Sequence, residues 1–541
     1  MPFYGAPLRI PNRSLTSVLI VEPTLGLDVS QPSVDAPLGS TPDSDNYIMR
    51  EGSLEPRPML SLRQSGAHVF NANTRVLGGQ EIVDVTGVRY SLTQSTTSIA
   101  WYSNTSWSQL SYVSAGGIDA PPSGTATDYW DTNQIYFDLR DENIAVFGND
   151  SYQSLYCWQS NTTVFSTLTG APRARRITTH DNFILAANVR SGNSDFVQRI
   201  QWSDRGSASS WTGGLSGYED LLAARGGITR LMSQENQVIV LFDNETWRGL
   251  RSDFPSVFRF EPLDANVGCP YPWTAADTPL GVIFLGRDYH VYLLPKGGGQ
   301  PQPIGQRLHR AIRNLIDQPQ RAWGHYDHQL DAYRLFYPIK GGTGLPQREV
   351  ALNLQSGAWA PQSYDRVSGN LSLTRGFEVQ LSSSATTWGG LAAAGIRWAD
   401  LAMSWAELGG ASEERALLAG SSTGTAYYFN SNATSDTGTS VPCYWQSSAL
   451  LGDEPSLQHT LTEVRVDYQA DSASSLTVRI SQNQGASFGG GQRISLPQTS
   501  GISQAVAYPY VPARYPMIRV ESEGQRHRLF RFFLTLRRGG R

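Results

Sequence analysis

The stretch DNFILAANVRSGNSDFVQRIQW (residues 181–202) indicates the fold class of the chain. Its two apolar runs, FILAANV and FVQRIQW, have the length of β-strands, and the residues between them are polar types found in tight turns. Asn, Asp and Gly tolerate the positive φ angles that close a β-hairpin. The stretch therefore predicts two neighbouring antiparallel strands.

Similar units recur between about residues 68 and 430, at intervals of roughly 40 to 50 residues. Each unit has strand-length apolar runs, a tight polar turn and a nearby aromatic residue. The other units are 88–110, 134–158, 237–250, 281–294, 333–359 and a remnant at 424–430. One meander of strands buries only one face by itself, so six or seven such units stacked radially predict a β-propeller. Unrelated hairpins in two β-sandwiches are the alternative.

The two ends of the chain have different patterns, and together with the repeats they predict an all-β protein with few short helices. Residues 1–66 are rich in Pro, as in VSQPSVDAPLGSTPDSDNY (29–47), and predict an extended arm that contributes to a platform. Residues 67–435 form the propeller-like repeat domain, and residues 436–541 alternate between apolar and polar positions, which predicts an antiparallel β-sandwich. The apolar positions of this alternation are Val464, Val466, Leu476, Val478, Ile480, Phe530, Phe532, Leu534 and Leu536.

Two segments are expected to interrupt the β-structure. IGQRLHRAIRNLID (304–317) predicts an amphipathic helix whose apolar face is formed by Leu308, Ile312, Leu315 and Ile316. The segment at 385–408 contains the pattern W-x-x-L three times, and its aromatic residues pack either on their own domain or on a neighbouring subunit.

Composition excludes several classes of protein. Of 541 residues, 40% are hydrophobic and only 17% are charged, which argues against extensive disorder. The net charge of −4 means that attraction to nucleic acid or to anionic lipid requires a local patch. Cys157, Cys269 and Cys443 are odd in number and far apart, so neither disulfides nor a zinc site is expected. No signal peptide or transmembrane segment is expected either, which predicts synthesis and folding in a cytoplasm.

Motifs for catalysis are missing from the sequence. It has no G-x-S-x-G, H-E-x-x-H or Walker A pattern. His325 and His328 form one close pair, but on a strand and turn their side chains are expected to point to different faces, as polar turn residues do. SQNQGASF (481–488) resembles the Asp-box hairpin of sialidase-like propellers, which is structural in the families that carry it. The sequence therefore predicts no enzyme, no catalytic residues, no metal ligands and no cofactor.

The carboxyl-terminal segment GQRHRLFRFFLTLRRGGR (524–541) is the strongest basic patch of the chain. It could contact nucleic acid or an acidic partner protein, or it could be a solvated edge strand whose charge discourages aggregation. Its arginines are Arg526, Arg528, Arg531, Arg537, Arg538 and Arg541.

The amino-terminal stretch GLDVSQPSVDAPLGSTPDSDNYIMREGSLEPRPML (26–60) resembles the opening of virion proteins from tailed bacteriophages. The similarity rests on an asparagine followed by a hydrophobic residue and on the pattern Gly-x-Leu-x-x-Arg-Pro, although Met59 stands where these proteins usually have glycine. A blade with the pattern W-S-D-x-G-x-x-x-x-W adds to it. The matching residues are Asn46, Gly52, Leu54, Arg57, Pro58, Trp202, Asp204, Gly206 and Trp211.

The nearest such family is the tail nozzle or tail hub (tail tubular) proteins of short-tailed bacteriophages. The resemblance implies a structural virion protein, assembled in the host bacterial cytoplasm, that forms a ring homo-oligomer, typically a homohexamer, below the portal. The implied partners are the portal-tail adaptor protein, tail fibres or spikes, and double-stranded DNA that passes transiently during genome ejection, without stable membrane insertion. The alternative is a propeller that binds or cleaves host glycans.

Overall fold

The computed structural model describes residues 16–64, 69–70, 74–84, 88–102, 106–114, 120–136, 143–160, 162–252, 256–365, 371–381, 414–451, 458–524 and 526–538. The chain divides into two compact units. We call residues 58–355 and 363–439 the propeller unit, and residues 1–57, 356–362 and 440–541 the sandwich unit. Both units are made of short β-strands, so the chain is all-β with one short α-helix in its described part.

In its described residues the propeller unit has seven blades, and seven is the upper of the two numbers expected from the sequence. Blade 1 has β8 (Gly78–Val83), β9 (Arg89–Gln94), β10 (Ile99–Tyr102) and β11 (Trp107–Gln109). Blade 2 has β13 (Trp130–Tyr136), β14 (Asn143–Asn149), β15 (Tyr156–Gln159) and β16 (Val164–Thr167), with β12 (Ser111–Tyr112) beside β16. Blade 3 has β17 (Arg173–His180), β18 (Phe183–Ser191), β19 (Ser194–Trp202) and β20 (Gly217–Asp220).

The remaining four blades follow in chain order. Blade 4 has β21 (Ile228–Gln234), β22 (Gln237–Phe242), β23 (Thr246–Arg251) and β24 (Phe258–Asp264). Blade 5 has β25 (Ala276–Thr278), β26 (Gly281–Leu285), β27 (Val291–Pro295) and β28 (Gln302–Pro303). Blade 6 has β29 (Trp323–Asp327), β30 (Ala332–Tyr337), β31 (Arg348–Asn353) and β32 (Trp359–Ser363), although residues 359–362 of β32 are counted with the sandwich unit. Blade 7 has β33 (Leu373–Leu381), β34 (Glu414–Ser421) and β35 (Ala426–Asn430).

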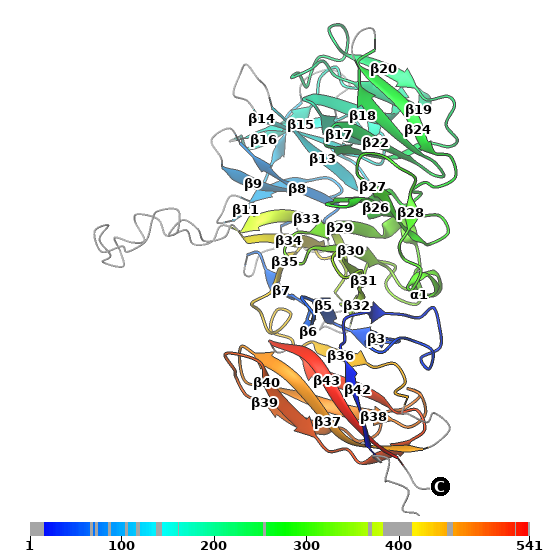
Figure 1. The fold of residues 1–541 in the computed structure, drawn as a ribbon. Helices are drawn as coiled ribbons and strands as arrows, with labels where there is room; N and C mark the ends of the chain where they lie inside the picture. The colour runs from blue at the N-terminus through cyan, green and yellow to red at the C-terminus, as the bar shows by residue number, and fades with distance from the viewer. Residues whose placement is uncertain are drawn as a thin grey trace, which may run out of the picture. The chain divides into compact units, whose positions relative to one another are not determined.

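Blade 7 is completed by a strand from the other end of the propeller unit. β7 (Met59–Leu62) pairs antiparallel with β35, in the register Leu62 to Tyr427 and Met59 to Asn430 (Figure 1). The backbone N–H of Leu60 also donates to Asp436 Oδ1 at 2.7 Å. The first and last parts of the propeller unit therefore share one sheet, which closes the circle of blades.

The first strands of the blades surround the propeller axis and are linked by polar side chains. Gln134 of β13 donates from Nε2 to the carbonyl oxygen of Val83 on β8. Asn133 donates from Nδ2 to the carbonyl oxygen of Ile177 on β17 at 3.1 Å. Glu81 of β8 accepts the backbone N–H of Gln380 on β33 at 2.9 Å. These bonds join neighbouring blades, because they pair polar groups that have no partner within the sheet of their own blade.

The sandwich unit has two sheets whose inner faces form its core. The first has β40 (Ser503–Ala507), β37 (His459–Ala470), β43 (His527–Arg538), β6 (Ser53–Pro56) and β5 (Tyr47–Arg50), with β1 (Thr16–Val21) beside β43 and β41 (Val511–Ala513) beside β37. The second has β39 (Gln492–Leu496), β38 (Ser474–Ser481), β42 (Met517–Glu523), β36 (Pro442–Gln446) and β4 (Ser44–Asp45). β2 (Gly26–Leu27) and β3 (Ser40–Thr41) form a small parallel pair.

The domain boundaries of the structure differ from those expected. The propeller unit begins at residue 58, eight residues before the predicted end of the arm at 66, because Met59–Leu62 is the closing strand of blade 7. The rest of the described arm belongs to the sandwich unit, where β1 and β6 pair with β43 and β4 pairs with β36. Pairing with late strands supplies the partner surface that these weakly apolar residues need.

The predicted helix at 304–317 is shorter in the structure, and one residue of its predicted apolar face, Leu315, is not buried. α1 covers His309–Leu315. Leu308, Ile312 and Ile316 are buried, but Leu315 is 49% exposed. Ile316 has extended dihedral angles and forms a β-bridge with Ile339, so the helix ends at Leu315. The segment 385–408 lies outside the described residues.

The alternation predicted in the last strand changes phase at one point. Phe532, Leu534 and Leu536 are buried as expected, but Leu529 is buried in place of Phe530. The pairing of β37 with β43 shifts register between Asp467 and Tyr468, which face Arg531 and Leu529. This β-bulge adds one residue and moves the inward position by one.

Candidate functional site

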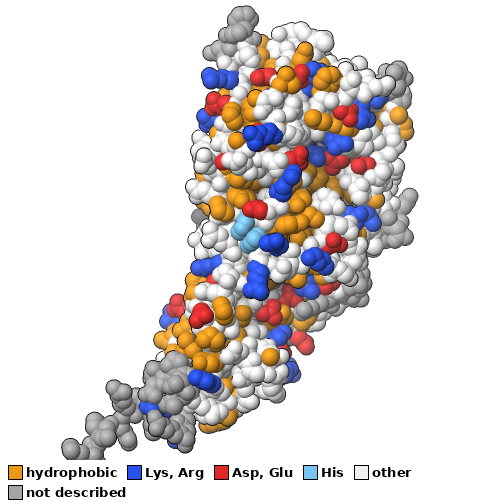
Figure 2. Space-filling view, turned by 90° about the vertical axis from the view of Figure 1, so that its right-hand side faces the viewer, with side chains coloured by type: hydrophobic (Ala, Val, Ile, Leu, Met, Phe, Trp, Pro, Cys, Tyr) orange, Lys and Arg blue, Asp and Glu red, His pale blue; other side chains and the backbone are white. Residues whose placement is uncertain are grey.

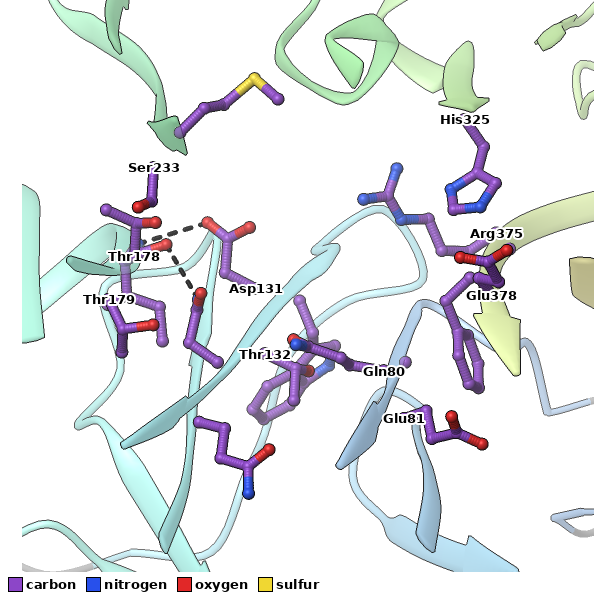
Figure 3. A pocket seen from close by; sticks show the side chains of 18 of the residues that line it. Gln80, Glu81, Asp131, Thr132, Thr178, Thr179, Ser233, His325, Arg375 and Glu378 are labelled. Carbon is purple, nitrogen blue, oxygen red and sulfur yellow. Dashed lines mark hydrogen bonds between the residues drawn. The ribbon is translucent and has the colours of Figure 1, made fainter. Parts of the chain in front are cut away.

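A cavity of about 650 Å³ lies on the axis of the propeller unit. Its wall is formed by the first strands of six blades, β8, β13, β17, β21, β29 and β33. The side chains that face it are mostly polar, as Figure 3 shows for Gln80, Thr132, Thr178 and Ser233. The axis of the propeller is therefore a polar space bounded by the first strands of almost every blade.

One side of the axial region is formed by a buried indole surrounded by arginines. Trp273 lies in the 3₁₀ turn η1 (Pro272–Thr274) before blade 5 and is 2% exposed. The guanidinium carbons of Arg176, Arg230 and Arg375 lie 4.9, 4.8 and 4.5 Å from its ring centroid. Cation–π attraction of this kind is strongest when the groups are removed from water. We call Trp273 and these three arginines the axial cluster.

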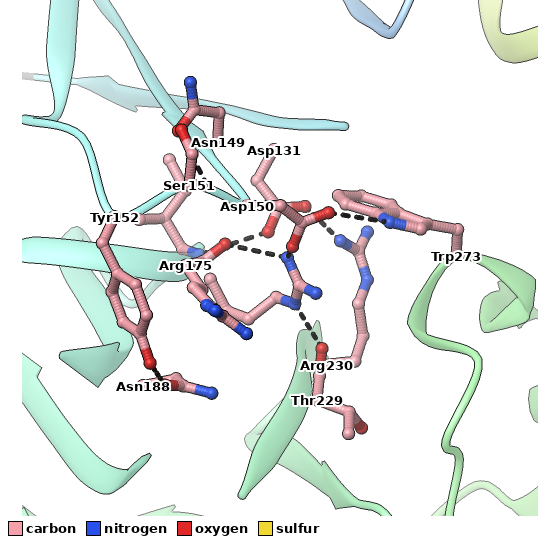
Figure 4. A network of polar contacts seen from close by, with 12 residues as sticks. Asp131, Asn149, Asp150, Ser151, Tyr152, Arg175, Asn188, Thr229, Arg230 and Trp273 are labelled. Carbon is pink, nitrogen blue, oxygen red and sulfur yellow. Dashed lines mark hydrogen bonds and ion pairs between the residues drawn. The ribbon is translucent and has the colours of Figure 1, made fainter. Parts of the chain in front are cut away.

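Two carboxylates neutralise two of the three arginines. Arg176 forms an ion pair with Asp150. Arg230 forms one with Asp131 (Figure 4). The indole N–H of Trp273 also donates to Asp150 Oδ2 at 3.3 Å. Burial raises the pKa of Asp150, although the Arg176 guanidinium acts against that rise.

Arg375 differs from the other two arginines of the axial cluster. It donates from Nη1 to the backbone oxygen of Trp273 at 3.4 Å, and no carboxylate of the described residues is within ion-pairing distance. Its guanidinium points into the cavity (Figure 3). Burial lowers the pKa of Arg375 to about 9, and the nearby Arg230 guanidinium contributes to that shift. Arg375 is thus a cation with poor compensation.

His325 of β29 lies beside Arg375 in the same cavity (Figure 3). Its Nε2 is buried and has no hydrogen-bond partner among the described residues. Burial lowers the pKa of His325 to about 4, so the ring is neutral near pH 7. His328, three residues later, is exposed in the following turn and contacts Glu378 Oε1 at 2.8 Å. The side chains of His325 and His328 therefore point to different faces of the strand and turn, as the sequence predicts.

The carboxylates at the cavity wall are already engaged. Glu81 pairs with Arg89 at 3.3 Å, and Glu378 pairs with His328 and lies 4.0 Å from Arg415. Burial raises the pKa of both carboxyl groups. Within the described residues, no group of three or more His, Cys, Asp or Glu side chains is placed to hold a metal ion. The site is suited to binding a polar or anionic group.

The residues of the amino-terminal motif lie in the sandwich unit and not at the cavity. Glu51 and Gly52 both have positive φ and join β5 to β6, which is the type I′ geometry of a two-residue hairpin. Arg57 is buried and donates from Nε to Asn46 Oδ1 at 3.0 Å, and Asn46 Nδ2 donates to the carbonyl oxygen of Pro442 at 2.9 Å. Leu54 is fully buried, and Pro58 is the first residue of the propeller unit.

The tryptophan motif of blade 3 organises the loop between β19 and β20. Trp202 and Trp211 are both buried, and their indole N–H groups donate to the backbone oxygens of Leu215 and Ala208. Asp204 Oδ1 accepts the backbone N–H groups of Arg205 and Leu215, while Gly206 has φ of 67°. These contacts are local to the loop.

The carboxyl-terminal arginines face acidic residues of the amino-terminal segment. Arg528 lies 3.2 Å from Glu55 and 3.8 Å from Glu51, and Arg531 lies 3.4 Å from Glu22. Arg526 is half-buried, Arg537 and Arg538 are exposed at the end of β43, and Arg541 lies outside the described residues. The expected basic patch is therefore partly neutralised within the sandwich unit.

Comparison with known proteins gives similarity of architecture alone. No family model and no curated protein matches the chain. A solved exo-β-1,3-galactanase from Phanerochaete chrysosporium with galactose is 10% identical over 88% of this chain and 100% of its own, with a TM-score of 0.28. The Pan2 WD40 domain of Neurospora crassa is 8% identical over 72% and 99%, with a TM-score of 0.35. BamB from Moraxella catarrhalis is 8% identical over 69% and 98%, with a TM-score of 0.31.

Proposed function

We propose that the chain is a structural virion protein of a short-tailed bacteriophage, a tail nozzle or hub subunit that assembles with identical copies into a ring. The observation that carries the proposal is the pair of open edges on the first sheet of the sandwich unit. The strand order of this sheet ends at β40 on one side and at β5 on the other, and β1 pairs with β43 on the side of β6. Within the described residues neither β1 nor β40 has a second strand partner.

Both strands lack charged residues, and each has exposed apolar side chains in it or directly beside it. β1 has the sequence TSVLIV, with Val18 and Ile20 59% and 54% exposed. β40 has the sequence SQAVA and is flanked by Ile502 and Tyr508, which are 65% and 55% exposed. Monomeric proteins usually protect edge strands with charges, Pro or bulges. β1 and β40 contain no charge and no Pro, although Pro512 of β41 follows β40 along the same side of β37. Their positions on opposite sides of the β37–β43 pair favour head-to-tail association.

Head-to-tail contacts between identical subunits close into a ring when the rotation between neighbours allows it. In this proposal β1 of one subunit adds to β40 of the next, and the number of subunits is six, as the resemblance of the amino-terminal motif implies. The axial cavity of about 650 Å³ is far too small for duplex DNA. The genome would pass through the lumen of the ring, with the portal-tail adaptor above it and fibres or spikes attached outside.

A further point in favour is the role of the motif residues. Asn46 and Arg57 are 0% and 1% exposed, and Arg57 donates to Asn46. Asn46 in turn donates to the carbonyl oxygen of Pro442, the first residue of β36. The motif therefore supports the sandwich unit, the part that bears the two edges. The described part of the chain has no helix long and apolar enough to cross a membrane.

The test is assembly of the purified full-length chain, measured by mass photometry and negative-stain electron microscopy. We expect closed rings from the wild type. The double variant Val18→Lys/Ile20→Lys should remain monomeric because charges on an edge oppose strand addition. Leu222→Lys is the control, since Leu222 is 80% exposed on the propeller unit. A wild-type monomer that binds or cleaves host glycan would contradict the proposal and favour an adhesin.

A further inference from the structure

We propose that the axial cavity of the propeller unit binds a small oxyanion, a phosphate or a carboxylate, through the guanidinium of Arg375 with His325 and Arg230 beside it. The inference does not depend on the ring proposed above, because every group it uses lies in the propeller unit. It rests on the balance of charge and on unpaired donors at one place.

Of the three arginines of the axial cluster, one has no carboxylate partner among the described residues. Arg176 is neutralised by Asp150 and Arg230 by Asp131, whereas Arg375 bonds only to the backbone oxygen of Trp273. The other carboxylates at the wall, Glu81 and Glu378, are held by Arg89, His328 and Arg415. Asp131 and Asp150 act on Arg375 only at longer range, because each is already paired with another arginine. An anion that enters beside Arg375 therefore gains electrostatic energy.

The donors around Arg375 are also unfilled. A guanidinium has five N–H donors in a planar fork, and the hydrogen bond to Trp273 uses one of those of Arg375. Arg230 Nε and His325 Nε2 are both buried and lack partners among the described residues. A neutral imidazole can carry its proton on Nε2 and donate it. Phosphate and carboxylate oxygens match this set because they accept several N–H bonds at once.

The remaining wall indicates what else the ligand can carry. The cavity is much larger than a phosphate ion, and its other lining groups include the hydroxyl of Thr178 and the amide of Gln80 (Figure 3). The hydroxyls of Thr132 and Ser233 also line it, and they are bonded to Gln94 and His180. Such groups donate to and accept from hydroxyls. The ligand is therefore either free phosphate surrounded by water or an acidic sugar whose carboxylate lies against Arg375.

The experiment is isothermal titration calorimetry of the full-length protein with sodium phosphate and, separately, with sodium glucuronate, at constant ionic strength balanced with sodium chloride. We expect saturable binding of about one ion per chain by one or both probes and none by chloride. Binding of phosphate alone identifies free or esterified phosphate as the source, and binding of glucuronate alone identifies an acidic sugar.

Arg375→Gln should weaken binding at least tenfold, because it removes the one arginine of the cavity wall that has no carboxylate partner among the described residues. Arg89→Gln is the matched control, since Arg89 lines the same cavity but is paired with Glu81, and its affinity should stay within twofold of the wild type. If Arg375→Gln does not fold, His325→Asn replaces it, with an expected loss of about threefold. Absence of saturable binding in the wild type, or equal affinity in the wild type, Arg375→Gln and His325→Asn, overturns the proposal.

Discussion

Trp445 of β36 and Phe532 of β43 stack face to face across the core of the sandwich unit, with ring centroids 5.3 Å apart and planes only 1° from parallel. Both side chains are fully buried, and each comes from a different sheet. The pair therefore joins the two layers. The indole N–H of Trp445 has no acceptor among the described residues, so the site uses the area of the indole but not its polar group.

The first prediction concerns this pair. Trp445→Ala should lower the free energy of unfolding of the sandwich unit by about 3 to 5 kcal/mol, because it leaves a large cavity. Trp445→Phe should change it by less than about 1.5 kcal/mol, since the lost area is offset by removal of an unsatisfied N–H. Urea unfolding, with hydrogen exchange to assign the transition to the sandwich unit, measures both. Equal losses for the two variants would contradict the explanation.

The second prediction concerns a buried ion cluster in blade 6. Arg334 is fully buried and forms a two-pronged contact with Glu349 at 2.6 and 2.8 Å and a third bond to Asp327 at 2.8 Å. Arg334→Met should destabilise the propeller unit by about 3 to 5 kcal/mol, because two buried carboxylates lose their cation. Urea unfolding is the measurement. The control is Arg205→Met, which breaks the exposed pair with Asp181 and should cost less than about 1 kcal/mol.

The third prediction is a pH dependence from His325. Its pKa is about 4 in the folded protein, where burial is the main cause and Arg375, Arg334 and His328 add to it against Asp327. In the unfolded chain it is about 6.5. Between these values the unfolded state binds more protons, so the free energy of unfolding should fall as the pH drops from about 6.5 to 4, by at most about 3 kcal/mol.

The comparison with His325→Gln isolates that contribution. His180 and His290 also have lowered pKa values from burial and act in the same direction, while the raised pKa values of Glu81 and Glu378 act in the opposite one. The slope of unfolding free energy against pH should be smaller in His325→Gln than in the wild type. Identical slopes would show that His325 titrates normally in the folded protein.

The fourth prediction concerns closure of the propeller. Leu60 is fully buried on β7, whereas Leu62 on the same strand is 37% exposed. Leu60→Ala should destabilise the propeller unit by about 2 to 5 kcal/mol, and Leu62→Ala by less than about 1 kcal/mol. Hydrogen exchange of blade 7 amides should accelerate in the first variant only. Faster exchange confined to other blades would contradict the closing role of β7.

The blades were predictable from the sequence because their middle strands are buried on both faces. Six of the seven expected units contain all or nearly all of the second and third strands of one blade, as for β22 and β23 at 237–250 and β26 and β27 at 281–294, whereas the remnant at 424–430 covers β35 alone. In β22, all six residues are buried. Continuous apolar runs of this kind give a strong local signal.

The cavity was not predictable in the same way. The first strands carry polar side chains toward the axis, so β17, with the sequence RARRITTH, has no apolar run to mark it. Arg375 and His325 are separated by 50 residues and Trp273 by another 52, and nothing in the local sequence indicates that they meet. The sequence also predicts β7 as part of the arm. β7 pairs with β35, a strand far along the chain, and nothing in the four residues of β7 indicates that pairing.

The pairing of β7 with β35 also delays the completion of folding during biosynthesis. β35 leaves the ribosome about 370 residues after β7, which at 5 to 20 residues per second is a delay of roughly 20 to 75 s. During that interval β7 has no strand to pair with, and β1 remains without its partner β43 for even longer. Both units of the nascent chain therefore remain unfinished until translation is nearly over, and a truncated product lacking the last strands would leave its amino-terminal segments unpaired and prone to aggregate.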